Sequence, residues 1–191
     1  MGIGSRAPRW IVKNLTVYLM RNDPALLQRR MSGGPAAEKR SVQKIAMLLV
    51  SIGFIASLAV PAFDYRLGRS KVPLEATVAG DVLVVLSFYV IFLACKENTF
   101  ASSTVEVAAD QRVISTGPYA WVRHPMYTGA LLLFLGTPLA LGSYWGLIAF
   151  AAYLPGILWR LLDEERLLAE TLPGYAEYRQ EVRWRLIPKI F

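Results

Sequence analysis

Residues 45–63 (IAMLLVSIGFIASLAVPAF) form a run of about 19 residues without a charged side chain. A helix needs roughly 20 such residues to cross a hydrocarbon core about 30 Å thick. Residues 77–95 (TVAGDVLVVLSFYVIFLAC) form a second apolar run of similar length, which contains Asp81 near its start. A carboxylate there is expected to lie in the first turns of a helix, close to the membrane interface. The two runs predict two membrane-spanning helices.

The overall composition agrees with a membrane protein. The 191 residues are 54% hydrophobic and 18% charged, which is too apolar for an ordinary soluble domain. The formal net charge is +7, and the apolar runs make an anionic bilayer surface a better partner for it than nucleic acid, for which no motif is present. The single cysteine excludes an internal disulfide, and one cysteine with one histidine argues against a metal site.

A third apolar stretch, residues 129–162, is too long for one crossing. The sequence TPLALGSYWG in its middle (137–146) is rich in turn-forming residues. The pattern therefore predicts a helical hairpin with arms at 126–141 and 144–162. The second arm is expected to continue beyond the membrane through RLLDEERLLAE, because that segment keeps helical periodicity.

The N-terminal region is basic. Residues 10–20 (WIVKNLTVYLM) favour a short amphipathic helix lying in the membrane interface, with a partial fifth span as the alternative. Residues 31–40 (MSGGPAAEKR) indicate a flexible linker. We therefore expect an all-α integral membrane protein with about four transmembrane helices, a C-terminal hairpin and an N-terminal interfacial helix. One domain is expected over 1–191, with a basic segment and linker at 1–44; a family resemblance described below implies a short cytoplasmic cofactor-binding segment and a catalytic half at 98–191.

Loop charges predict the orientation, because Lys and Arg prefer the cytoplasmic side. Four crossings with the N-terminus inside place 18 of the 21 Lys and Arg in cytoplasmic segments and three in the loop at 64–76. Both termini and the loop at 96–126 are then cytoplasmic.

A tight hairpin also brings its ends together. Arg123 and His124 at its entrance should therefore approach the charged residues at its exit: Arg160, Glu164 and Glu165.

The C-terminal half resembles the isoprenylcysteine carboxyl methyltransferases and their prokaryotic relatives, integral membrane enzymes that use S-adenosylmethionine. The similarity covers about residues 98–191 and is carried by GPYAWVRHPMYTG, EERLL and LPGYAEYRQEVRWRLIP at residues 117–129, 164–168 and 172–188. It implies a lipophilic methyl acceptor and a cofactor pocket formed by Gln111, Arg112, Val113, Ile114, Tyr119, His124, Pro125, Met126, Tyr127 and Glu164. Gln111 stands where many relatives have histidine, which puts the details of that contact in doubt but still offers a hydrogen-bonding amide.

The candidate catalytic residues are Arg160 and Glu165, and the resemblance implies the roles of Arg160 and Glu164. Arg160 would bind the reacting group of the substrate, and its guanidinium suits a carboxylate. Glu164 would pair with polar groups of the cofactor. Methyl transfer from a sulfonium to a carboxylate needs alignment and no general base. An amine, thiol or phenol acceptor would need one, and Glu165 or His124 would be recruited.

Other interpretations of the same residues stay open. Tyr119, Trp121 and Tyr127 are also typical of an interfacial aromatic belt, and DEERLLAE is also typical of a solvated helix face. Two rival functions remain: an NADPH-dependent membrane reductase of the sterol-reductase type, and a non-catalytic lipid-binding protein. Carboxyl O-methylation of an isoprenylcysteine-like substrate is the favoured reaction. The sequence does not identify the acceptor or the oligomeric state.

Overall fold

The computed structural model describes residues 7–38, 40–105, 107–108 and 110–191, and the side chains from residue 15 onward within these ranges. The described residues form helices and no strands. The elements are α1 (Ala7–Asn22), α2 (Pro24–Met31), α3 (Ser41–Leu67), α4 (Leu74–Glu97), the 3-10 helix η1 (Gly117–Ala120), α5 (Pro125–Ala140), α6 (Gly146–Thr171) and α7 (Tyr175–Glu181).

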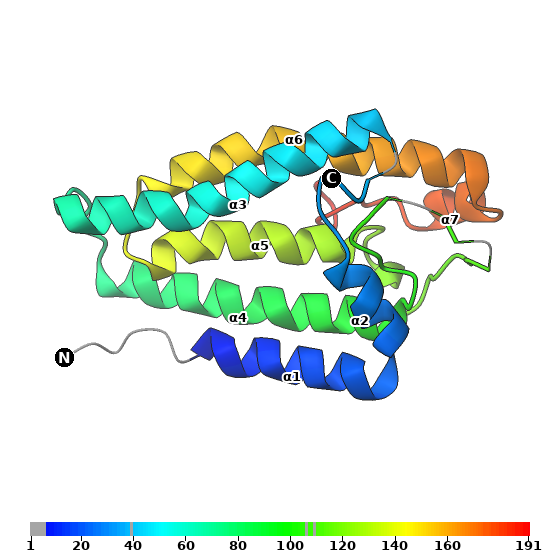
Figure 1. Cartoon of the computed structure of the whole chain (residues 1–191), viewed down its shortest axis with the longest axis horizontal. Helices are drawn as coiled ribbons and strands as arrows, with labels where there is room; N and C mark the ends of the chain where they lie inside the picture. Colours follow the sequence, from blue (N-terminus) through cyan, green and yellow to red (C-terminus); the bar gives the residue numbers. More distant parts are fainter. Residues whose placement is uncertain (1–6, 39, 106, 109) are drawn as a thin grey trace.

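Helices α3, α4, α5 and α6 form an antiparallel bundle in which each helix runs opposite to the one before it (Figure 1). The short connections 68–73 and 141–145 lie at one end of this bundle. The chain from α2 to the start of α3, the long connection from α4 to α5 and the chain after α6 gather at the other end, which we call the loop end (Figure 1). The hairpin predicted for the third apolar stretch is confirmed as α5 and α6.

Glycines let α4 and α5 approach closely. A Cβ atom added to Gly136 on α5 would lie 2.8 Å from the carbonyl oxygen of Gly80 on α4, and one added to Gly129 would lie 3.1 Å from the carbonyl oxygen of Ser87. Any larger residue would force the two backbones apart. A glycine also lets α3 approach α6 closely, because a Cβ on Gly53 would lie 2.9 Å from the ring of Tyr153.

The end opposite the loop end is held by a buried carboxylate. Asp64, near the end of α3, accepts hydrogen bonds from the Ser143 hydroxyl at 2.5 Å and from the Ser70 backbone N–H at 3.1 Å. Gly142 completes the α5–α6 turn with a φ of 69°, in the left-handed region that favours glycine. These contacts fix the two short connections to each other and set the register of the hairpin.

The outer faces of the bundle are apolar. Ile52 and Leu58 on α3 and Val82 and Leu86 on α4 are exposed, as side chains facing lipid would be. Among the described helices, α3, α4 and α6 are long and apolar enough to cross a membrane, and α5 is a shorter apolar helix of 16 residues. The predicted all-α integral membrane fold is confirmed.

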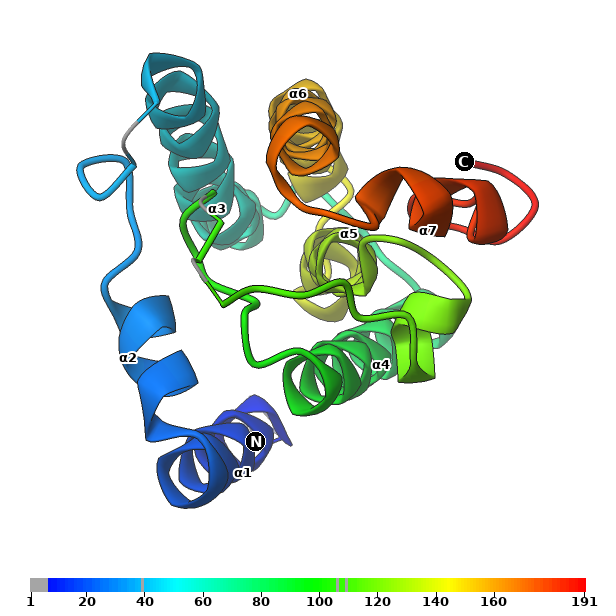
Figure 2. The same ribbon diagram turned by 90° about the vertical axis from the view of Figure 1, so that its right-hand side faces the viewer.

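The direction of α1 differs from the predicted interfacial helix. It runs alongside α4 and parallel to the bundle, and the end-on view shows the same neighbourhood (Figures 1 and 2). The rings of Tyr18 on α1 and Phe92 on α4 meet edge to face with centroids 5.1 Å apart, and Leu19 is buried in a cluster with Cys95. The apolar face of α1 is therefore used for packing against another helix. Its 16 residues are about 24 Å long, less than a full crossing.

The segment predicted as a flexible linker is packed against the loop end. A Cβ on Gly33 would collide with the side chain of Ser103, and the carboxylate of Glu38 is buried. We call residues 31–38 the N-terminal strap. The close contacts of this segment are at Gly33 and Glu38, and composition alone does not show them.

Candidate functional site

A cavity of about 590 Å³ opens at the loop end of the bundle. Figure 2 shows the connection after α4 crossing this end between α3 and α4. The cavity is lined by that connection together with residues of α3, η1, α5, α6 and α7. Its volume lies within the range of sites that hold drug-sized ligands or cofactors.

The cavity gathers nearly all the site residues expected from the sequence. The lining includes Gln111, Arg112, Val113, Ile114, Tyr119, His124, Pro125, Met126, Tyr127, Arg160 and Glu164. Glu165 is not part of the lining. The entrance and the exit of the hairpin therefore meet at one place, as the tight turn predicts.

Glu164 and Tyr127 join the two arms of the hairpin at the cavity wall. The Tyr127 hydroxyl donates a hydrogen bond of 2.5 Å to Glu164 Oε2. Glu164 is half-buried, and His124 packs its ring 5.6 Å from the ring of Tyr127. A carboxylate in this position offers its remaining lone pairs to a ligand that carries an ammonium or hydroxyl group.

Glu165 points into a different environment. Its Oε1 lies 2.7 Å from Arg123 Nε and 3.2 Å from His124 Nε2, and its Oε2 lies 2.8 Å from Arg185 Nε. Arg123 also donates to the carbonyl oxygens of Val182 and Arg183, each at 2.8 Å. The carboxylate thus ties the hairpin entrance to the C-terminal segment and has no face toward the cavity. The catalytic role expected for Glu165 does not fit this position, because a base must reach the reacting group.

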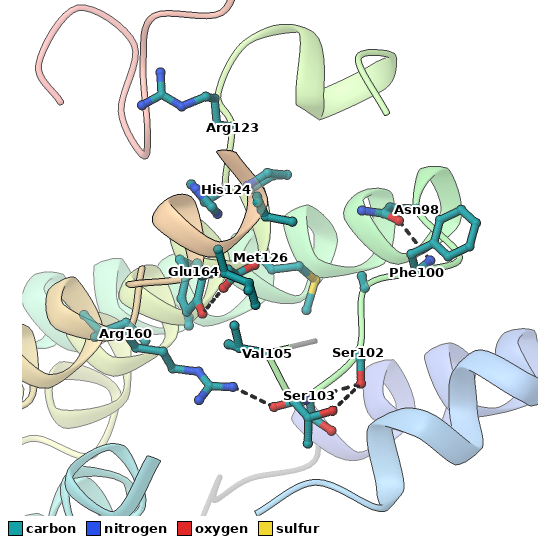
Figure 3. Close-up of a pocket in the computed structure, with 18 of the residues that line it drawn as sticks. Asn98, Phe100, Ser102, Ser103, Val105, Arg123, His124, Met126, Arg160 and Glu164 are labelled. Carbon is teal, nitrogen blue, oxygen red and sulfur yellow. Dashed lines mark hydrogen bonds between the residues drawn. The ribbon is translucent and has the colours of Figure 1, made fainter. Parts of the chain in front are cut away.

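Arg160 lines the cavity from α6 and is almost fully buried. Its Nη1 lies 2.6 Å from Glu38 Oε1 and donates to Gln43 Oε1 at 2.8 Å, and its Nη2 donates to the Ser103 carbonyl at 2.8 Å. Figure 3 shows the guanidinium extended across the cavity toward Ser103. A guanidinium has five N–H donors, so two, at Nε and on Nη2, are not used by these three partners.

Gln111, the residue that replaces histidine, has a local role. Its side-chain oxygen accepts a hydrogen bond of 3.1 Å from the backbone N–H of Ala108. The amide therefore closes its own turn. This contact orients the backbone of residues 111–114 along the cavity.

Sequence reasoning missed several parts of the lining, among them Arg30 of α2, five residues of α3 and two further segments. One is the first part of the connection after α4, including Asn98, Phe100 and residues 102–105, labelled in part in Figure 3. It carries no recognisable motif. The other is α7, which contributes Tyr175 and Tyr178, and the signal for it was present in the family-like segment at residues 172–188.

The α7 tyrosines are buried and protonated. Burial raises the pKa of Tyr175 and of Tyr178, as it does for Tyr119 in η1. The Tyr178 hydroxyl donates to the Tyr119 carbonyl at 2.7 Å. The Tyr175 hydroxyl has no hydrogen-bond partner within the part of the chain that the structure describes. A buried donor without a partner is costly, and its position in the cavity wall makes it a candidate ligand contact.

The other end of the cavity is apolar and lies between α3, α5 and α6. Phe134 and Tyr153 stack there with ring centroids 4.0 Å apart, and Phe54 meets Phe134 edge to face at 6.0 Å. Phe54 and Ile55 belong to the lining and are also 49% and 64% exposed on the outer face of α3. The apolar end therefore reaches the surface that faces lipid.

The donor set of the cavity suits a ligand that carries ammonium and hydrogen-bond acceptor groups. Glu164 suits a cationic ammonium group, and the Tyr175 hydroxyl is an uncommitted donor in the same wall. In the described ranges of the chain, no group of three or more His, Cys, Asp or Glu side chains is arranged to hold a metal ion.

Comparison with known proteins matches the same part of the chain. A family model described as phospholipid methyltransferase matches residues 76–173, from α4 to the end of α6. The Protein-S-isoprenylcysteine O-methyltransferase of Saccharomyces cerevisiae is 30% identical over 129 residues, which is 63% of this chain and 51% of the relative. The protein of the same name from Schizosaccharomyces pombe is 33% identical over 79 residues, 38% of this chain and 32% of the relative.

The chain spans about half the length of the first relative and a third of the second. These relatives confirm the resemblance to isoprenylcysteine carboxyl methyltransferases. The family model itself covers just over half of the 191 residues, including both arms of the hairpin and the Arg160–Glu164 turn of α6. The protein belongs to the phospholipid methyltransferase family.

Proposed function

We propose that this protein catalyses S-adenosylmethionine-dependent methyl transfer to a lipophilic acceptor at the membrane–cytosol interface, and that the acceptor group is the carboxylate of an isoprenylcysteine-like molecule. The observation that carries the proposal is the two-ended cavity. Its polar end holds Glu164, Tyr127 and residues 111–114, and its apolar end opens beside Phe54 toward lipid. One cavity therefore suits a polar donor and an oily acceptor together.

The polar end is assigned to the cofactor. S-adenosylmethionine supplies an electrophilic methyl group on a sulfonium. Glu164 is suited to hold a cationic ammonium or a hydroxyl group, with Tyr127 fixing the carboxylate through the 2.5 Å hydrogen bond. Residues 111–114 would contribute backbone groups, and His124, Pro125 and Met126 would form the wall of the pocket. Tyr119 and Tyr175 would enclose it from η1 and α7.

The acceptor is assigned to the apolar end, with its reacting group beside Arg160. The two guanidinium donors not used by Glu38, Gln43 and Ser103 are suited to orient a carboxylate through charge-assisted hydrogen bonds. A carboxylate is already ionised near neutral pH, so this reaction requires no general base. Glu165 is paired with Arg123, His124 and Arg185 and does not line the cavity. This arrangement is consistent with a reaction that needs no general base.

We further propose that the loop end faces the cytosol. The chain from the end of α1 to the start of α3, the connection between α4 and α5 and the chain from the end of α6 onward lie at that end and carry most of the Lys and Arg residues of the chain. Cytoplasmic loops are enriched in these residues. A cysteine introduced at Ser102 should therefore react with an impermeant reagent only after the cytoplasmic face is exposed.

The test is a methyl-transfer assay with labelled S-adenosylmethionine over prenylated carboxylates, phospholipid amines, phenols and thiols, using purified protein in lipid nanodiscs. Label should enter the prenylated carboxylate, and Arg160→Ala should depress turnover while calorimetry still detects binding of S-adenosylhomocysteine. Binding of NADPH with no binding of either methionine derivative would support the reductase alternative and overturn the proposal. Cofactor binding without transfer to any acceptor class would contradict the catalytic role.

A further inference from the structure

Glu38 is a buried carboxylate on the N-terminal strap, outside the region that the family model matches. Its side chain is 1% exposed. Removing a carboxylate from water is expensive unless partners compensate for the lost hydration. The identity of those partners shows how Glu38 connects to the cavity.

Both partners of Glu38 are hydrogen-bond donors. Oε1 lies 2.6 Å from Arg160 Nη1, and Oε2 accepts from the backbone N–H of Val105 at 3.2 Å. A carboxylate satisfies both donors at once, whereas a glutamine offers one acceptor oxygen and would turn an NH2 group toward the other donor. The position therefore requires a carboxylate, and an amide of the same size cannot replace it.

The partners of Glu38 both belong to the cavity wall. Arg160 and Val105 line the cavity, but Glu38 does not, so it holds the guanidinium from behind. The neighbouring Ser103 reinforces this arrangement, because its carbonyl accepts from Arg160 Nη2 at 2.8 Å. Glu38 thus fixes the position of Arg160 relative to residues 103–105.

The segment that carries Glu38 is itself anchored to the same connection. Arg29 and Arg30 in α2 donate to the carbonyls of Thr99 and Ala101 at 2.6 Å and 3.0 Å. The Ser103 hydroxyl donates back to the carbonyls of Arg29 and Arg30 at 3.0 Å and 2.9 Å. These bonds hold the end of α2, where the strap begins, against the connection that carries Ser103 and Val105.

We propose that Glu38 is a positioning residue of the methyl-transfer site, which it serves by fixing Arg160 at the acceptor end of the cavity. This inference rests on the proposed function. It makes the N-terminal strap a part of the active site although the strap lies before the family-matched region. Glu38 acts on the acceptor through Arg160 and does not contact the cofactor pocket.

The test uses the full chain in nanodiscs and compares Glu38→Gln with Arg40→Gln. Arg40 is a matched control because it also forms an ion pair with α6, to Asp163 at 2.9 Å, but is 40% exposed and lies outside the cavity lining. Glu38→Gln should lower kcat/KM for the acceptor about tenfold or more, because small misplacements of an orienting group are costly. S-adenosylhomocysteine affinity should stay within about twofold of the unaltered protein, and Arg40→Gln should leave both quantities near their original values.

A double-mutant cycle separates positioning from general stability. In an Arg160→Ala background, Glu38→Gln should cause no further loss of turnover, because its effect passes through Arg160. Equal turnover of Glu38→Gln and the unaltered protein would overturn the proposal, as would an additive loss in the double variant or a parallel loss of cofactor affinity. Where Glu38→Gln does not fold, Glu38→Asp serves instead, because the shorter carboxylate cannot span both donors and should show the same selective loss.

Failure of the proposed function would appear differently, as absence of methyl transfer by the unaltered protein. The contact between Glu38 and Arg160 is then tested by the rate at which phenylglyoxal modifies Arg160, measured by peptide mass spectrometry. Glu38→Gln should speed this reaction severalfold relative to Arg40→Gln. Equal rates in the two variants would overturn the contact on which the proposal stands.

Discussion

Replacing Glu165 with glutamine tests whether this residue is structural or catalytic. The carboxylate is 4% exposed and lies within 3.2 Å of three nitrogen donors, on Arg123, His124 and Arg185. Glutamine keeps the volume but removes the negative charge, and its NH2 group must face a donor. Breaking a buried ion pair on one side costs about 3–5 kcal/mol, because the partner charge stays buried without compensation.

The expected loss is large enough to measure. A loss of about 3 kcal/mol corresponds to a fall in Tm of roughly 6–12 °C for a chain of this size. Thermal unfolding in detergent, followed by tryptophan fluorescence, measures it. Glu170→Gln is the control, since Glu170 is an exposed carboxylate on the same helix and should change Tm by no more than about 1–2 °C.

The two roles give different patterns. A structural Glu165 predicts a lower Tm and, at a temperature where the variant is folded, a pH–rate profile with the same shape as that of the unaltered protein. Abolished turnover with an unchanged Tm would refute the structural assignment and restore Glu165 as a base. An unchanged Tm with unchanged turnover would refute the buried cluster itself.

Other substitutions test the remaining parts of the site and the fold. Glu164→Ala should weaken S-adenosylhomocysteine binding by calorimetry about tenfold, the value of one charge-assisted hydrogen bond; an unchanged affinity would remove Glu164 from the cofactor pocket. Tyr175→Phe should weaken the same binding about twofold to tenfold without lowering Tm, because its hydroxyl has no partner among the described residues. Gly136→Val should destabilise the protein by about 1–3 kcal/mol in thermal unfolding, since a Cβ there already meets the Gly80 carbonyl at 2.8 Å; an unchanged Tm would contradict the close α4–α5 contact.

The four helices of the bundle were predictable because each one carries its own signal. Apolar runs predicted the cores of α3 and α4, and the turn residues around Gly142 predicted the hairpin. The hairpin in turn predicted that His124 approaches Glu164 and Glu165, because a tight reversal brings the two ends of its arms together. These expectations depend on local composition and chain connectivity, which the sequence contains.

The different environments of Glu164, which lines the cavity, and Glu165, which does not, were not predictable in the same way. Adjacent residues on a helix point about 100° apart, so one of the two must turn away from the cavity. Which one does so depends on how α6 is rotated against its neighbours. Glu165 forms ion pairs with Arg123 and Arg185, which come from two distant segments. Glu164 accepts a hydrogen bond from Tyr127 on α5.

The contacts of the strap were not predictable for a related reason. A segment rich in Gly, Pro and Ala looks flexible when its own side chains are too small to form a core. The structure shows that the packing comes from its partner, because Ser103 fills the space beside Gly33. Glu38 gave no sequence signal either, since its partners lie 67 and 122 positions further along the chain, at Val105 and Arg160.

The polar half of the site exists because α6 extends beyond α5 at the loop end. Tyr127, near the start of α5, meets Glu164, and α6 continues for seven more residues to Thr171, a distance of about 10 Å. No part of α5 lies opposite this extension, so its inner face is covered by other elements: Leu168 packs with Leu172, Tyr175 and Val113. The polar end of the cavity is therefore built largely from connecting segments that pack against α6. The apolar end lies where α3, α5 and α6 run side by side, so α6 contributes residues to both ends of the cavity.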